Sequence, residues 1–564
     1  MYRARRWYEK GALTVFAIAL AIIFSFAKRE EAAVPVPVEY KVFAWNDLGM
    51  HCYDSDFSIF SLLPPFNTVH AQVVKKGKSP KLATSNDITV KYAATPAPHP
   101  KDSINSTSVG KTNFWMYSPA LFGANLPVDQ GLTGTWMPQN TSRAMNFALP
   151  NEWTAMGIPI TNWDDKGNFN AYPMLRISAT VKGASKPANS LDVVVPVSSE
   201  MDCKSCHQTG GMAANETHLE LGVVLSRNSN LDLQSRENIL KVHDARYNTN
   251  LWRQRPVLCA SCHYSKALDL TGLGPNETQR AHDYLSDAMH ARHGKTLDNH
   301  FPTDTNHAII SETGVSACYK CHPGNQTNCL RSVMASAGVG CQNCHGDLLA
   351  VGGVFPLADG RLREPWTDLP KCQSCHTGDY VQNIGGGYPR LLAHDPHDVA
   401  ATPYEAPNSR FAENPRTLYR NSKGHGGLAC IACHGSPHAE WPATDPLAND
   451  NLTSNQLQGH SGVIMECSTC HDSSLANTLK GPHGMHNVNS TAWVKDHKSL
   501  VEKNGMIACK ACHGADLLGT HLSVTPVART FTISDRRKMN VAAGAKISCN
   551  MCHVMPKKPD YPSK

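Results

Sequence analysis

Several features that would place the chain in other classes are scarce or missing. Charged side chains make up only 18% of the 564 residues, below the roughly 25% of an average soluble domain. Outside the N-terminus no apolar run is long enough to cross a bilayer, which argues against a polytopic membrane protein. Glycine and proline, with 40 and 36 residues, are near average usage, so neither collagen nor a low-complexity disordered chain fits. No run of lysine and arginine with interleaved aromatic residues indicates a nucleic-acid partner.

Cysteine and histidine are in excess, with 20 and 28 residues. Eighteen of the cysteines fall in nine copies of the pattern Cys-x-x-Cys-His, whereas a shuffled chain of this composition should hold about 0.04 copies. In chain order, motifs 1 to 9 are Cys203/Cys206/His207, Cys259/Cys262/His263, Cys318/Cys321/His322, Cys341/Cys344/His345, Cys372/Cys375/His376, Cys430/Cys433/His434, Cys467/Cys470/His471, Cys509/Cys512/His513 and Cys549/Cys552/His553.

This pattern is the attachment signal for c-type haem. Its two thiols form thioethers with the haem vinyl groups, and the following imidazole is the proximal ligand of the iron. On these motifs the sequence resembles the multihaem c-type cytochromes over residues 203–553, which implies nine covalent haems c. A zinc site would need paired Cys-x-x-Cys units and would not explain the histidine after every second cysteine. A thioredoxin-like centre would explain one motif rather than nine.

The N-terminus predicts export. Residues 1–10 carry four basic side chains, and the apolar residues 11–27 end in the small-x-small pattern Ser25-Phe26-Ala27. We therefore interpret residues 1–27 as a secretory signal peptide, or as a signal anchor if they are not cleaved, and residues 28–38 as a linker. Either reading predicts a periplasmic, cell-surface or extracellular protein, which is membrane-anchored in the second case.

Residues 39–200 hold no haem motif and are expected to form a mostly-β, sandwich-like domain. Runs rich in Val, Ile and Tyr predict strands at residues 39–44, 88–93, 175–181 and 191–197. This domain would serve either as a docking or capping module for the haems or as a packing scaffold that covers the first of them.

Residues 201–564 are expected to form a nonahaem cytochrome c domain of short helices and irregular loops wrapped around the haems. The motifs follow one another at intervals of 23 to 59 residues without a fixed period, which excludes a regular solenoid. The 351 residues from 203 to 553 leave 39 residues for each haem, too few for a conventional core around each one. The haems must therefore lie close together, as in an electron conductor. The formal charge of +6 does not indicate nucleic acid, because nine haems would add up to about 18 propionate charges.

Each iron also needs a sixth ligand or an open site, and 19 histidines lie outside the motifs. The expected distal ligands lie shortly before or after a motif or crowd a group of motifs. They are His425, His460, His438, His483, His486, His497, His521, His290, His293, His307, His243, His218, His394, His397 and His51, with His282 and His300 in the same pool. On a helix, the four-residue spacing of His434 and His438 would point both rings to the same side.

Two cysteines, Cys52 and Cys329, lie outside the motifs. In an exported chain they predict a disulfide that ties the β domain to the haem domain. The alternative is a reactive thiol or an iron ligand at a substrate-binding haem.

Two classes of function compete. The first is an electron-transfer protein that carries electrons through mostly bis-His haems. Its acceptors would be redox partner proteins, other cytochromes, minerals or electrodes. A filament built from copies of the chain belongs to the same class. The second is a multihaem oxidoreductase that acts on a small nitrogen or sulfur compound at an open iron. The ammonia-forming nitrite reductases carry a Cys-x-x-Cys-Lys haem, and this chain has no such motif. The surplus of histidines favours full ligation of the irons, hence the first class.

Overall fold

The computed structural model describes residues 39–552 except 149, 216–221, 298–317, 347, 355–359, 365, 373–409, 416, 473–474, 476–477 and 535–536. Tyr40–Lys564 groups into one compact unit, and Met1–Glu39 is a separate unit. The predicted signal segment 1–27 and linker 28–38 lie outside the described residues. No helix in the described part of the chain is both long and apolar enough to cross a membrane.

Two antiparallel sheets form the N-terminal part of the compact unit. The first has the strand order β1 (Tyr40–Asn46), β4 (Asn67–Lys75), β9 (Glu152–Ile158) and β8 (Asn146–Ala148), with β5 (Lys81–Leu82) paired to β4. The second has the order β11 (Asn189–Val194), β10 (Met174–Val181), β6 (Ile88–Thr95) and β7 (Arg143–Ala144). The predicted mostly-β, sandwich-like fold is confirmed.

The two sheets share one apolar core because their strands alternate between buried and exposed side chains. In β6, Ile88, Val90 and Tyr92 are buried while Thr89 and Lys91 are exposed. Strand β1 contacts β11 of the other sheet, and the side chains of both strands belong to the same cluster of buried residues. Burial of alternate side chains from both sheets is what stabilises a sandwich.

The rest of the unit consists of short helices, turns and loops. The helices are α2 (Phe114–Phe122), α3 (Lys204–His207), α4 (Leu231–Tyr247), α5 (Glu277–Arg280), α6 (Leu285–Leu297), α8 (Val333–Ser336), α9 (Cys341–His345), α10 (Leu348–Val351), α11 (Cys430–His434), α12 (Asn451–Gln458), α13 (Thr491–Asn504) and α14 (Ile507–His513). Short strand pairs are β2 (His51–Cys52) with β12 (Val197–Ser198), β3 (Phe60–Ser61) with β13 (Val257–Leu258), and β14 (Arg529–Ser534) with β15 (Arg537–Val541). Short helices with irregular loops were expected here, and this part of the fold prediction is also confirmed.

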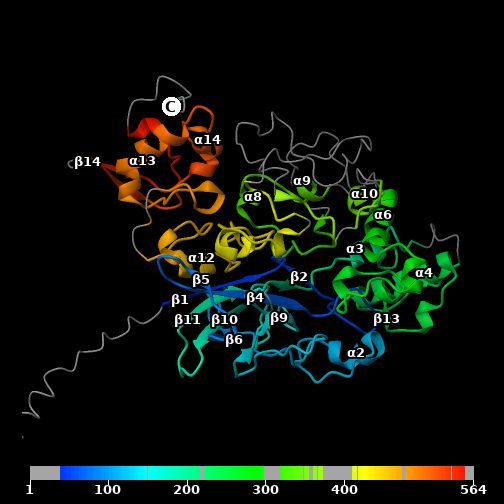
Figure 1. Ribbon diagram of the computed structural model, residues 1–564. Coiled ribbons are helices and arrows are strands. Elements are labelled where there is room, and N and C mark those ends of the chain that lie inside the picture. Colours follow the sequence, from blue (N-terminus) through cyan, green and yellow to red (C-terminus); the bar gives the residue numbers. More distant parts are fainter. Residues whose placement is uncertain are drawn as a thin grey trace, which may run out of the picture. The chain divides into compact units, whose positions relative to one another are not determined.

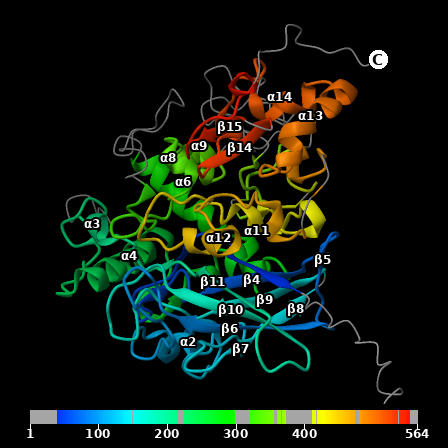
Figure 2. The same cartoon turned by 90° about the vertical axis from the view of Figure 1, so that its left-hand side faces the viewer.

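The β sandwich and the motif-bearing segment are packed directly against each other. Ile431 and Ala432 of α11 are 0% and 1% exposed and belong to the same buried cluster as β1. Gln72 of β4 donates to the carbonyl of Gly427 at 3.1 Å and accepts from the amide of Ala429 at 2.8 Å. Helix α12 contacts β1 and β11, and Figures 1 and 2 both show it beside β11. These contacts are with motif 6 and fit both interpretations of the β domain, so its role and the boundary at residue 200 stay predictions.

Candidate functional site

Each described motif lies on a single helical turn, which explains its spacing. In motif 1 the amide of His207 donates to the carbonyl oxygen of Cys203 at 2.9 Å. In motif 7 the amide of His471 donates to the carbonyl oxygen of Cys467, also at 2.9 Å. Residues three and four apart on a helical turn lie on one face. The turn therefore presents two thiols and an imidazole to one side, as attachment of a planar group through two thioethers and an axial nitrogen requires.

The motif histidines face other histidines at a distance that fits an iron between them. An imidazole nitrogen binds a transition metal at about 2 Å and lies roughly 1 Å from its own ring centre, so trans imidazoles have ring centres about 6 Å apart. The pairs are His207–His293 (6.3 Å), His290–His322 (6.1 Å), His345–His438 (6.2 Å), His434–His483 (5.8 Å), His425–His471 (6.1 Å) and His486–His513 (6.5 Å). In each pair one histidine belongs to a motif and the other to the expected distal ligands, so the residues present fit bis-His haem.

Motif 2 has two histidines at this distance. The ring of His263 lies 5.6 Å from that of His282 and 6.5 Å from that of His243. Only one of them can be trans to His263 on a single iron. His243 is among the expected distal ligands, and His282 is the second candidate at this site.

Backbone carbonyls fix the orientation of several of these rings. The Nδ1 atom of His513 lies 2.9 Å from the carbonyl oxygen of Ile547, and that of His483 lies 2.8 Å from the carbonyl oxygen of Arg410. On α6, Nδ1 of His290 lies 2.8 Å from the carbonyl oxygen of Ser286, one turn earlier. Such a hydrogen bond holds the proton on Nδ1 and leaves Nε2 as the metal-binding nitrogen.

Burial favours the neutral, iron-binding form of several of the paired imidazoles. It lowers the pKa of His345 to about 3 and those of His207, His290, His438 and His486 to about 4. Neighbouring charged groups lower the pKa of His345 further, by less than burial does, and His438 contributes most among these groups. A neutral imidazole is ready to bind a metal without losing a proton.

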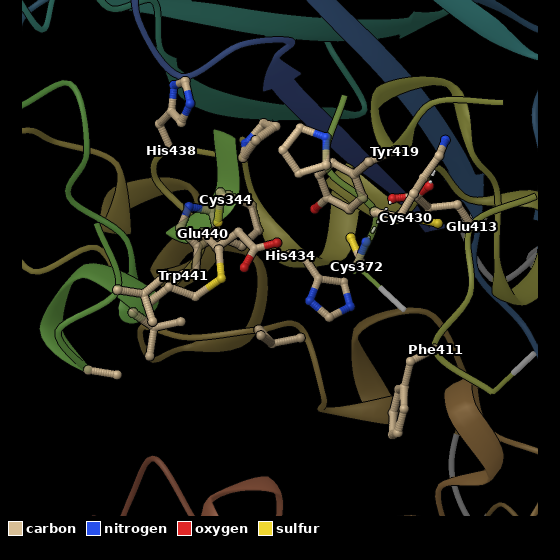
Figure 3. A pocket seen from close by; sticks show the side chains of 18 of the residues that line it. Cys344, Cys372, Phe411, Glu413, Tyr419, Cys430, His434, His438, Glu440 and Trp441 are labelled. Carbon is tan, nitrogen blue, oxygen red and sulfur yellow. Dashed lines mark hydrogen bonds and ion pairs between the residues drawn. The ribbon is translucent and has the colours of Figure 1, made fainter. Parts of the chain in front are cut away.

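One continuous cavity of about 2230 Å³ joins most of the motifs. Cysteines of motifs 3, 4, 5, 6, 8 and 9 line it, together with the distal candidates His290, His293, His438, His483 and His486. Close up, Figure 3 shows Cys344, Cys372, Cys430 and His434, from motifs 4, 5 and 6, around the same space. A cavity of this size between facing imidazoles and thiols can take several macrocycles in series.

The cysteines of motifs 1, 2 and 7 do not line this cavity, although the sequence predicts the same attachment role for all eighteen motif cysteines. Cys206 and Cys262, the second cysteines of motifs 1 and 2, are half-buried, and Cys206 Sγ lies 3.8 Å from the Ser205 hydroxyl. Local packing explains this placement. Helix α3, which carries Cys206, contacts α4, and Cys259, three residues before Cys262, packs on an apolar cluster that contains Leu240 of α4. The structure therefore does not bring Cys206 and Cys262 into the shared cavity, and their attachment role stays a prediction.

Among the other predicted site residues, His51, His497 and His521 line the cavity. His51 Nε2 is 2.8 Å from a carboxylate oxygen of Asp47, and His460 Nε2 is 3.3 Å from one of Glu466, so each of these two rings contacts a carboxylate. Cys375, His376, His553, His218, His307, His394 and His397, and His300 with them, lie outside the described residues.

The expectation that His434 and His438 share a helix face is wrong. Helix α11 ends at His434, and Gly435 adopts a φ of +89° that only glycine tolerates readily. A Cβ at this glycine would also lie 3.1 Å from the carbonyl oxygen of Ala439. The chain therefore leaves the helix, and His438 faces His345 instead.

Cys52 and Cys329 are free thiols that line the same cavity. Burial and the neighbouring Cys329 raise the pKa of Cys52 well above its usual value. The Sγ atom of Cys329 is also 3.7 Å from Nδ1 of His438. The structure contains no bond between the two sulfurs, and the disulfide stays a prediction.

Trp493 is a site residue that the motif pattern did not indicate. Its ring stacks on His486 at 4.2 Å and 4°, and His486 is nearly parallel to His513, at 11°. The only signal in the sequence is the four-residue spacing from Trp493 to His497, whose Nδ1 lies 3.0 Å from the Trp493 carbonyl oxygen. Trp493 therefore fixes the plane of one axial ring.

We expect Trp493→Leu to alter the low-temperature EPR spectrum without loss of haem. Nearly parallel axial imidazoles give a rhombic low-spin signal, and steeply crossed ones give a strongly anisotropic signal. His290–His322 and His486–His513 are nearly parallel, at 14° and 11°, whereas His207–His293 is crossed at 77°. Trp493→Leu frees the His486 ring and should reduce the rhombic signal. Trp163→Leu, at a site where the ring packs on Phe169, is the control, and an unchanged rhombic signal in Trp493→Leu would contradict the assignment.

The helical turns and the paired imidazoles are the arrangement that a multihaem c-type cytochrome requires. Residues 331–525, which hold motifs 4 to 8, match the family model described as outer membrane cytochrome MtrC/MtrF-like, domains II/IV. This match supports a multihaem cytochrome. The comparison with curated proteins found no match, and neither did the comparison with solved structures.

Proposed function

We propose that this protein is an exported nonahaem c-type cytochrome that conducts electrons through mostly bis-His haems. Both thiols and the imidazole of each motif would hold one haem, which supplies one-electron iron chemistry. Electrons would pass to redox partner proteins, other cytochromes, minerals or electrodes in the envelope or outside the cell, and the chain could also act as a filament subunit. The similarity to an outer membrane cytochrome supports the envelope location.

The pairing of histidines carries this proposal. Of the seven motif histidines that the structure describes, six face one further imidazole at 5.8 to 6.5 Å, and His263 faces two. An iron with two imidazoles has no free position for a substrate, so it can exchange electrons but cannot bind a small nitrogen or sulfur compound. Pairing at all seven described motif histidines therefore favours conduction over catalysis.

Mass spectrometry and EPR of the purified, oxidised protein test the proposal together. We expect the mass of nine covalently attached haems and low-spin iron signals, because each motif has two thiols and the described ones have paired imidazoles. Fewer than nine haems in mature protein would contradict the stoichiometry. A large high-spin signal that changes on addition of nitrite or hydroxylamine would support an enzyme instead.

A further inference from the structure

Three described imidazoles meet at motif 2, where one iron needs two. His282 and His243 both lie near the motif histidine His263, at 5.6 and 6.5 Å between ring centres. The hydrogen bonds of these three rings distinguish the candidate that lies across the iron from the one that does not. They also identify the side chains that hold the distal ring in place.

The position of His282 follows from a hydrogen bond of the proximal ring. Nδ1 of His263 lies 2.8 Å from the carbonyl oxygen of Asp283. In a histidine that binds iron through Nε2, Nδ1 is on the part of the ring turned away from the metal, so the Asp283 carbonyl lies on the proximal side. His282 is joined directly to Asp283, and consecutive Cα atoms are only about 3.8 Å apart. One residue cannot pass around the edge of a macrocycle, so His282 lies beside the proximal ring rather than across the iron.

His243 comes from a different element, helix α4. The helix is fixed by its buried side, where Leu240 and Val242 are 3% and 9% exposed. Asn248 follows the last helical residue in the left-handed conformation, with a φ of +53°. Asparagine tolerates this conformation at a helix end. The chain turns back there, and the Thr249 hydroxyl comes to lie 2.9 Å from Nδ1 of His243.

A chain of hydrogen bonds leads from His243 to a carboxylate. The Thr249 hydroxyl donates its one proton to Asp244 at 2.7 Å, so its oxygen accepts from Nδ1 of His243 at 2.9 Å. The imidazole proton is thereby held on Nδ1, and Nε2 is left to bind iron. Asp244 also accepts from the amides of Leu251 and Trp252, at 2.7 and 2.9 Å. Three such hydrogen bonds stabilise the charged form of the carboxylate.

Distal candidates at other motifs are held differently. Nδ1 of His290, His293 and His483 lies 2.8, 2.6 and 2.8 Å from a backbone carbonyl oxygen. A carbonyl carries no net charge, whereas the carboxylate behind Thr249 does. An imidazole whose N–H is bonded towards a negative charge is a stronger electron donor to its metal and stabilises the oxidised iron. The hydrogen bonds at motif 2 therefore lower the potential of its haem relative to the same site with a backbone carbonyl in place of Thr249.

We propose that His243 is the sixth ligand of the iron at motif 2, and that Thr249 and Asp244 position its ring and lower the potential of this haem. The inference rests on the proposed function and adds the distal ligand and the positioning residues at one of its sites. The hydrogen bonds from His243 to Asp244 set how readily this haem gives up its electron.

Alanine variants of the two candidates test the assignment by EPR of the oxidised protein. Both variants are made in the full chain, and mass spectrometry confirms that each keeps the wild-type number of haems. We expect His243→Ala to convert one low-spin iron into a high-spin iron that binds added imidazole. His282→Ala should stay low-spin, because its ring lies on the proximal side. Any other pattern overturns the assignment, and a wild-type protein whose irons are largely high-spin overturns the proposed function itself.

Three threonine variants test the positioning role. Thr249→Val keeps the shape of the side chain and removes the hydroxyl, whereas Thr249→Ser keeps a hydroxyl. Thr271→Val is the matched control, because the exposed Thr271 also donates to a carboxylate, that of Asp269, at 3.3 Å. The measurement is a potentiometric titration of each variant, followed by EPR and by optical spectroscopy.

We expect one haem of Thr249→Val to be reduced at a higher potential than in the wild type. At a fixed potential, the ratio of reduced to oxidised iron at this haem should rise about tenfold, which corresponds to about 59 mV for a one-electron couple. Thr249→Ser and Thr271→Val should both match the wild type. An unchanged titration of Thr249→Val, with His243→Ala still high-spin, overturns the positioning role and leaves the proposed function standing.

Discussion

His425→Ala should convert one low-spin iron of the oxidised protein into a high-spin iron that binds added cyanide or imidazole. The His425 ring lies 6.1 Å from that of His471, and its side chain is exposed. Its removal opens the sixth position of motif 7 and disturbs no buried packing. If the protein carries the nine haems proposed, about one-ninth of the iron should change spin state. Low-temperature EPR and optical titration with imidazole measure this change.

The matched control for this variant is His99→Ala. The His99 side chain is exposed, and His99 is not among the expected distal ligands. We expect the spectrum of His99→Ala to match that of the wild type. In His425→Ala, added imidazole should restore the low-spin signal. A spectrum of His425→Ala that remains entirely low-spin would show that another group binds the iron of motif 7.

Arg331→Ala should destabilise the compact unit by about 3–5 kcal/mol, the usual cost of leaving a buried charge without its partner. Arg331 is 1% exposed, and its guanidinium donates to both carboxylate oxygens of Asp450, at 2.7 and 2.9 Å. It also lies over the Tyr172 ring of the β domain at 5.0 Å. The Arg331 amide donates to the carbonyl of His438 at 2.8 Å. Chemical unfolding followed by far-ultraviolet circular dichroism measures the loss.

Two further variants separate charge pairing from general damage. Arg176→Ala breaks an ion pair with Asp192 in which the arginine side chain is 51% exposed. Its cost should be about 1 kcal/mol or less, because solvent screens such a pair. Arg331→Met/Asp450→Leu removes both charges and should recover part of the stability lost in Arg331→Ala. Equal losses in Arg331→Ala and Arg176→Ala would show that burial does not set the cost.

The sandwich was only partly predictable from the sequence. The strands expected at residues 88–93 and 175–181 are present as β6 and β10, because their alternating Val, Ile and Tyr side chains match one buried face. Strands β4 and β9 were not predicted. In β4, Gln72 is buried and breaks the apolar alternation, since its amide binds the backbone beside motif 6. A polar side chain buried by a partner 355 residues away leaves no local signal.

The sequence by itself determined the chemistry of this protein, and the tertiary structure decided its connectivity. In the described motifs two thiols and an imidazole within five residues lie on one helical turn, so the spacing alone predicts the proximal ligands. A distal ligand obeys no such rule, because it comes from whichever segment packs against the opposite side of the iron. His438 lies four residues from His434 but faces His345, 93 positions earlier in the chain, because α11 ends at Gly435. Which imidazoles meet, and therefore which motifs are neighbours, is set by packing between distant segments.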